Sequence, residues 1–87
     1  MTNIVRIVQQ MKTNPSGIRF EELKKACEYY FGKPRQSSGS HRIFKTPWPG
    51  NPRVNIQNNK GKAKRYQVKQ VLLAIEKFEA DYDSGNG

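Results

Sequence analysis

The spacing of apolar residues changes twice along this 87-residue chain, and this limits the folds open to it. Before residue 32 and after residue 65, apolar residues recur every three or four positions, the period of an amphipathic helix. Between residues 35 and 57 they alternate with polar residues, the period of a half-buried strand. The chain is therefore expected to be an α+β domain with a sheet segment between helical segments.

Two helices are expected before the sheet, at residues 3–12 and 20–31. Asn14–Gly17 separates them, because proline disfavours helical geometry in the residue before it and glycine permits the turn. Gly32 and Pro34 end the second helix. Cys27 lies on the apolar face of that helix, so we expect a buried core thiol and not a nucleophile.

Three antiparallel strands are expected, at residues 35–38, 41–45 and 53–57. In the last of them Val54 and Ile56 face the core, so the sheet has a core side and a polar side. The sequence does not decide on which face of the sheet His41 lies, because Gly39 could support a bulge that shifts the alternation by one residue. Residues 58–62 are expected to form a loop, without the glycine and lysine spacing of a P-loop.

A last helix is expected from the apolar stripe that runs from Val68 to Tyr82, broad enough to lie across the core side of the sheet. Residues 1–82 are thus expected to form a single domain, with residues 2–13 as an additional N-terminal helix. Residues 83–87 contain no apolar side chain and are expected to be a disordered tail.

The charge is concentrated in one part of the chain. The formal net charge is +9, from 16 Lys and Arg against 7 Asp and Glu, and residues 33–69 hold ten of the cations and none of the acids. A long positive stretch without local compensation is typical of a protein that binds a polyphosphate. Aromatic and amide side chains are interleaved with these cations, which favours nucleic acid over a merely solvated surface.

A single cysteine cannot form an internal disulfide, and the sequence contains neither a membrane-spanning apolar run nor a signal-peptide core. We therefore expect a cytoplasmic protein without a membrane partner.

His41 is the only histidine and the candidate for proton transfer. Zinc needs three or four Cys, His or carboxylate ligands, so we expect neither a metal nor another cofactor. Ser40 precedes His41 on a strand and would point to the opposite face, which excludes a serine triad. RNA carries its own nucleophile, the 2′-hydroxyl, so one proton acceptor and nearby cations would suffice to cleave it. Spacing alone leaves catalysis and RNA binding as alternatives.

Gly39-Ser40-His41, followed by Phe44 and then by a strand ending in Val54-Asn55-Ile56, resembles the HicA toxin family of bacterial toxin–antitoxin systems. The resemblance covers about residues 20–79. HicA toxins are small basic mRNA interferases with a fold like the double-stranded-RNA-binding domain, α-β-β-β-α. The resemblance implies that His41 is catalytic, that Gly39 and Ser40 shape its approach, and that Phe44 packs beneath it.

The resemblance also implies a HicB-type antitoxin that covers the active face, and an activity that inhibits translation and growth until the antitoxin binds. Arg42 stands where many family members have a second histidine, so it could only stabilise charge. The helix at residues 3–12 has no counterpart in the usual short domain, and it is expected either to extend the core or to add antitoxin-binding surface.

The leading prediction is therefore a metal-independent endoribonuclease that cleaves single-stranded stretches of mRNA. Trp48 and Tyr66 could stack on bases. Phosphate contacts are predicted at Arg42, Lys45, Arg53, Lys60, Lys62 and Lys64. The alternatives are a non-catalytic RNA-binding module of the double-stranded-RNA-binding type and a winged-helix DNA binder, although the long last helix argues against the latter.

Overall fold

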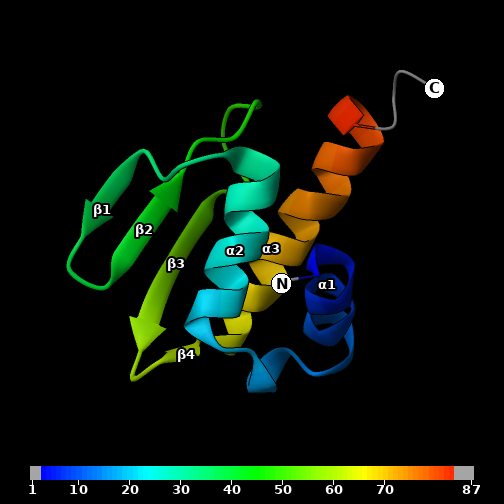
Figure 1. Cartoon of the computed structure of the whole chain (residues 1–87). Coiled ribbons are helices and arrows are strands. Elements are labelled where there is room, and N and C mark those ends of the chain that lie inside the picture. Colours follow the sequence, from blue (N-terminus) through cyan, green and yellow to red (C-terminus); the bar gives the residue numbers. More distant parts are fainter. Residues whose placement is uncertain (1–2, 84–87) are drawn as a thin grey trace.

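The computed structural model describes residues 3–83 of the chain (Figure 1). Its helices and strands follow one another as α1 (Ile4–Thr13), α2 (Phe20–Phe31), β1 (Gln36–Ser38), β2 (His41–Phe44), β3 (Val54–Asn59), β4 (Lys62–Ala63) and α3 (Arg65–Phe78). A 3₁₀ turn (Pro15–Gly17) joins α1 to α2, and a π-helical turn (Glu79–Asp83) extends α3. The expected tail begins in that turn, and its residues 84–87 lie outside the described residues.

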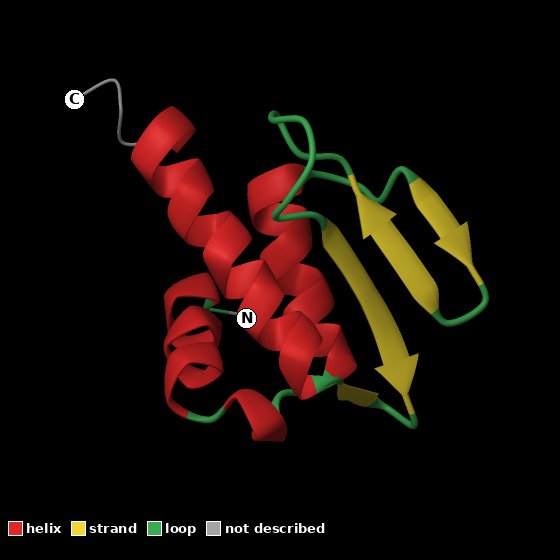
Figure 2. Ribbon diagram, turned by 180° about the vertical axis from the view of Figure 1, so that it is seen from behind, coloured by secondary structure: helices red, strands yellow, loops and turns green. Residues whose placement is uncertain are grey.

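The described chain forms three layers. The sheet is the first layer, and α2 and α3 lie together on one face of it, where both contact β3. The helix α1 packs against α2 and α3 on their far side from the sheet. Figure 2, seen from behind, shows all helices on one side of the sheet. The predicted α+β fold, with two helices before an antiparallel sheet and one after it, is confirmed.

The strands are antiparallel and lie in the order β1-β2-β3-β4. The prediction of a loop at residues 58–62 is wrong: β3 continues to Asn59, and β4 pairs with its end. Only Lys60 and Gly61 turn the chain, with φ angles of 55° and 85°, the left-handed pair that a two-residue hairpin requires. The side chain of Asn58 supports the turn by accepting a hydrogen bond from the Gly61 amide at 2.6 Å.

The core fills the space between the sheet and the helices α2 and α3. Phe44, Val54 and Ile56 project into it from β2 and β3, and each is at most 3% exposed. They belong to one buried cluster with Leu23 of α2 and Ile75 of α3. The predicted core side of β3 is therefore confirmed.

Cys27 is completely buried on α2, as its helix face predicted. Burial raises the pKa of its thiol far above the ordinary value, and the neighbouring charge of Glu28 raises it further. A thiol that stays protonated is a poor nucleophile, so Cys27 is a packing residue.

The helix α1 is an integral part of the core. The side chain of Asn3 caps its first turn by accepting a hydrogen bond from the Arg6 amide at 3.3 Å. Ile7 and Met11, one turn apart, are buried in the common cluster, whereas Val5 is 67% exposed. The additional helix therefore extends the core, one of its two expected roles. Among residues 3–83, no helix is long and apolar enough to cross a membrane.

Candidate nucleic-acid interface

The hairpin between β1 and β2 determines where the only histidine lies. Ser38 pairs with His41, so Gly39 and Ser40 alone connect the two strands. Gly39 has a φ of 56°, as the first central residue of a type II′ turn requires. The turn therefore explains why a glycine stands before Ser40 and His41, and the same turn places His41 at the first position of β2.

Replacing Gly39 with alanine is expected to destabilise the fold by about 1–3 kcal/mol, the cost of a sparsely populated positive-φ conformation for an L-residue. A Cβ atom at this position would meet no atom within 4 Å, so the cost comes from the backbone alone. Urea unfolding followed by circular dichroism measures it. Ser40→Ala is the control and should cost little, because Ser40, the second central residue of the turn, does not have a positive φ. Equal losses in both variants would contradict this account.

His41 lies on the sheet face that carries no helix. His41 pairs regularly with Gln57 and with Ser38, so no bulge shifts the alternation of side chains. The register therefore decides the face of His41, which the sequence alone did not. Its side chain is exposed and makes no hydrogen bond to any residue between 3 and 83. By alternation the same face carries Arg53 and Asn55, both exposed. The imidazole is thus accessible to a ligand lying across this face.

Arg42 belongs to the opposite face of β2, because its strand partner is the buried Ile56. Its Nη1 donates hydrogen bonds of 2.8 Å to the carbonyl oxygens of Gly39 and His41. Arg42 therefore braces the turn before His41. The structure does not bring it onto the face of His41, and its contact with phosphate remains a prediction.

A pocket of about 250 Å³ brings three cations together where β2 ends and β3 begins. Lys45 and Arg53 line it, and Arg35 joins them from the segment before β1. The Arg35 backbone is held there by a hydrogen bond of 2.7 Å from its amide to the Ile43 carbonyl. Arg35 was not among the predicted contacts, although its place in the acid-free stretch was a usable signal. Lys45 lies four residues from His41, or roughly 13 Å along the strand.

The remaining predicted cations lie at the other end of β3. Lys60 occupies the β3–β4 turn and Lys62 begins β4, and both are exposed. Lys64 is half-buried at the start of α3. Because Gln57, the partner of His41, is near this end of β3, His41 stands between two groups of cations.

The two aromatic candidates for base stacking have different surroundings. Trp48 is 7% exposed, packs edge-on against Phe31, and donates a hydrogen bond of 2.9 Å from its Nε1 to the Pro52 carbonyl. It is packed as a core residue, and it also lines the pocket that holds Arg35, Lys45 and Arg53. Tyr66 is 61% exposed and remains a candidate for stacking.

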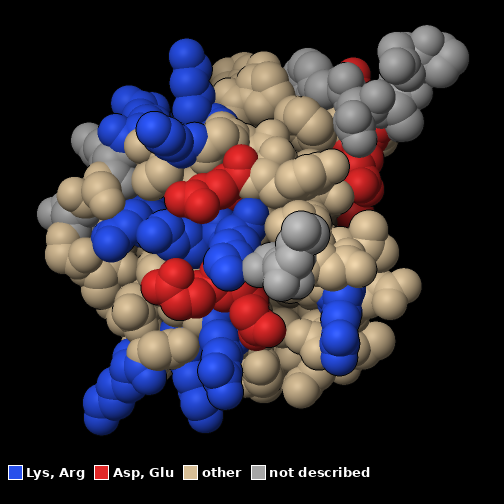
Figure 3. Space-filling view, viewed as in Figure 1, with Lys and Arg blue, Asp and Glu red and all other residues tan. Residues whose placement is uncertain are grey.

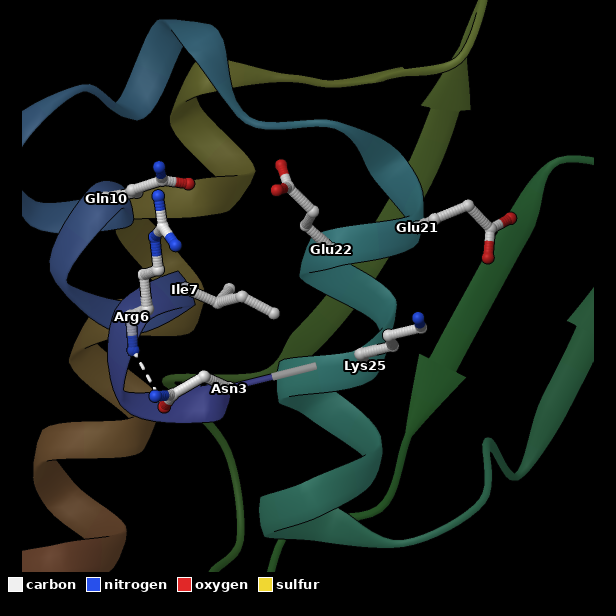
Figure 4. Close-up of a pocket in the computed structure, with 7 residues that line it drawn as sticks. All are labelled: Asn3, Arg6, Ile7, Gln10, Glu21, Glu22 and Lys25. Carbon is white, nitrogen blue, oxygen red and sulfur yellow. Dashed lines mark hydrogen bonds between the residues drawn. The ribbon is translucent and has the colours of Figure 1, made fainter. Parts of the chain in front are cut away.

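Acidic side chains lie on the helical side of the molecule. Figure 3 shows them among basic side chains on the side where α2 is nearest the viewer. A pocket of about 370 Å³ between α1 and α2 mixes Glu21 and Glu22 with Arg6 and Lys25 (Figure 4). Its charges compensate one another, so it is a weaker anion site than the sheet face. Within residues 3–83, no three His, Cys, Asp or Glu residues form a group that could hold a metal ion.

Comparisons with protein-family models, with characterised proteins and with solved structures give no match for this chain. The similarity to HicA toxins remains a prediction that depends on Gly39-Ser40-His41 and on the order of the elements.

Proposed function

We propose that this protein is an endoribonuclease toxin of the HicA type that cleaves single-stranded mRNA without a metal, with His41 as the general acid or base. One observation carries the proposal: an exposed imidazole stands on an open sheet face whose strands contain no acid, between two groups of cations. The part from α2 to α3 contains the elements of the α-β-β-β-α order of the double-stranded-RNA-binding domain, with the short strand β4 added between β3 and α3 and with α1 added before α2.

The proposed reaction uses the 2′-hydroxyl of the RNA as the nucleophile. In one form of the reaction His41 accepts the proton of this hydroxyl as its oxygen attacks the adjacent phosphorus, and water protonates the departing 5′-oxygen. In the other form His41 gives its proton to the departing 5′-oxygen, and water accepts the proton of the 2′-hydroxyl. The O2′–P bond forms and the P–O5′ bond breaks, so the products are a 2′,3′-cyclic phosphate and a 5′-hydroxyl. Cations stabilise the negative charge that develops on the phosphate, and no cofactor enters the reaction.

The proposed RNA path crosses the open face from one group of cations to the other. Lys45, Arg53 and Arg35 hold phosphates at one end, and Lys60 and Lys62 hold them at the other. Lys64 and Arg42 lie beside this path, and Gly39, Ser40 and Arg42 together set the position of His41. A single strand fits an open sheet better than a duplex does, because its bases are free to spread over the surface.

A toxin of this kind acts on mRNA in the cytoplasm, where Cys27 stays reduced. Cleavage of mRNA would stop translation and growth. In the proposed system a HicB-type antitoxin restrains the enzyme by covering the sheet face that carries His41.

The test is to incubate the purified protein with a long single-stranded RNA in excess chelator. We expect fragments that end in 2′,3′-cyclic phosphate, detected by end-specific labelling. An RNA with one 2′-deoxynucleotide at a mapped cleavage site is the control and should stay intact there. Intact RNA throughout would refute the proposed activity. If the protein binds the long single-stranded RNA but leaves it intact, it is a non-catalytic RNA-binding module, the alternative that the sequence also allowed.

A further inference from the structure

A groove of about 630 Å³ lies between α3 and the loop that precedes β3. Tyr66, Lys69, Leu73 and Lys77 line it from α3, at the three- and four-residue spacing that puts helix residues on one face. Pro52 lines it from the loop. Tyr66 and Leu73 are 61% and 59% exposed, so this apolar stripe is left over after the core has formed.

The groove lies close to the start of β3 and to its free edge: Asn51 and Pro52 precede this strand, and Gln70, which also lines the groove, comes one helical turn after Gln67, whose side chain contacts that edge. Among the described strands β2 pairs with one side of β3 from Val54 to Gln57, whereas β4 pairs with the other side only at Asn58 and Asn59. The Asn58 amide points towards β2, where it donates to the Ser40 carbonyl, so by alternation the amides of Gln57 and Asn55 point towards the free edge. Gln67 of α3 satisfies the first of these, accepting from the Gln57 amide at 2.8 Å. The Asn55 amide has no strand partner in residues 3–83.

The helix α3 lies next to this edge of β3. After the β3–β4 turn the chain reverses, and α3 runs back along β3, in contact with it (Figure 2). Lys77, near the end of α3, consequently lies by the loop before β3, with its Nζ 5.4 Å from the centre of the Trp48 ring. The groove thus has an apolar helix stripe on one side and, on the other, the loop that leads into the free edge of β3.

The chemistry of the groove favours a protein segment over RNA. Its exposed surface is mainly apolar, and of its two lysines Lys77 is already paired with Asp81 at 3.0 Å. A phosphate backbone would need a row of free cations, whereas an extended peptide needs unpaired backbone groups and apolar contacts for alternate side chains. Lys69, the absence of acids among the lining residues, and the chain's net charge of +9 favour an acidic peptide.

We propose that an extended acidic segment of a partner protein docks along the free edge of β3 as an added strand, with a bulky apolar side chain seated between Tyr66 and Leu73. Every second side chain of the segment would face the groove, and the others would present acids to the surrounding cations. This docking does not require that the protein cleave RNA.

The probe is a set of peptides of about twelve residues, selected for binding to the intact protein from a random display library. We expect the selected peptides to alternate bulky apolar with acidic residues. Leu73→Glu should weaken their binding about tenfold or more, because it places a charge in the apolar contact. Val5→Glu is the matched control: it adds the same charge at a similarly exposed apolar position on α1, and it should leave the affinity unchanged.

Hydrogen exchange of the isotope-labelled protein locates the peptide. The bound peptide should protect the Asn55 amide, while circular dichroism confirms that both variants are folded. Three results would overturn the proposal: selected peptides without an acidic and apolar alternation, equal effects of Leu73→Glu and Val5→Glu, or protection that leaves Asn55 unchanged. A short oligouridine that protects Asn55 while the peptides do not would reassign the groove to RNA.

Discussion

Replacing His41 with alanine is expected to slow RNA cleavage by about 10²–10⁴-fold, the usual contribution of a positioned acid or base. His41 is the chain's only histidine, and the strands of its sheet face contain no acid that could take over the proton transfer. The side chain is exposed, so its removal leaves no cavity in the core. Single-turnover cleavage of a labelled single-stranded RNA, at saturating protein, measures the loss.

Asn55→Ala is the matched control, because Asn55 is also exposed on the same face and carries no group that titrates near neutrality. It should cleave RNA at close to the original rate. Both variants should bind RNA with nearly the original affinity, since the cations supply most of the binding. Cleavage by His41→Ala at the rate of the unmodified protein would show that another group, or a contaminating nuclease, is responsible.

The helices and the main strands could be predicted because their patterns are local. The second helix has the predicted bounds, since its apolar period and the Gly32 stop coincide. The short strand β4 was missed because Lys60 is not a residue that signals a left-handed turn. Its pairing with the end of β3 is instead supported by the Asn58 side chain and by contacts with the segment before α2.

The candidate site was only partly predictable. The alternation of Val54 and Ile56 predicted the polar side of β3. The face of His41 depended on whether Gly39 forms a tight turn or a bulge, and the sequence could not decide this because glycine is favoured in both. Arg35 comes close to Lys45 and Arg53 only through the tertiary structure, which holds its backbone against Ile43. The burial of Trp48 depends likewise on Phe31, which is 17 positions away in the chain, and no local period reports such contacts.

The helix α1 lies outside the stretch that resembles HicA toxins, yet Ile7 and Met11 place it in the common core, so we expect it to contribute to stability. Replacing the fully buried Met11 with alanine is expected to cost about 2–5 kcal/mol, from lost apolar burial and the cavity left behind. A domain of this size has a total stability of roughly 4–13 kcal/mol, so the variant would be marginal. Guanidinium unfolding followed by fluorescence of Trp48, which lies in the same core cluster, measures the change.

Val5→Ala is the matched control, since it also shortens an apolar side chain of α1, but at a position that is 67% exposed. It should change the stability by no more than about 0.5 kcal/mol. If Met11→Ala lowers the free energy of unfolding no more than this control does, α1 adds little to stability, and the packing of α2 and α3 against the sheet supplies it. If the larger loss is found while the folded fraction still cleaves RNA at the original rate, α1 supports the core from the side opposite to His41 and takes no part in the reaction.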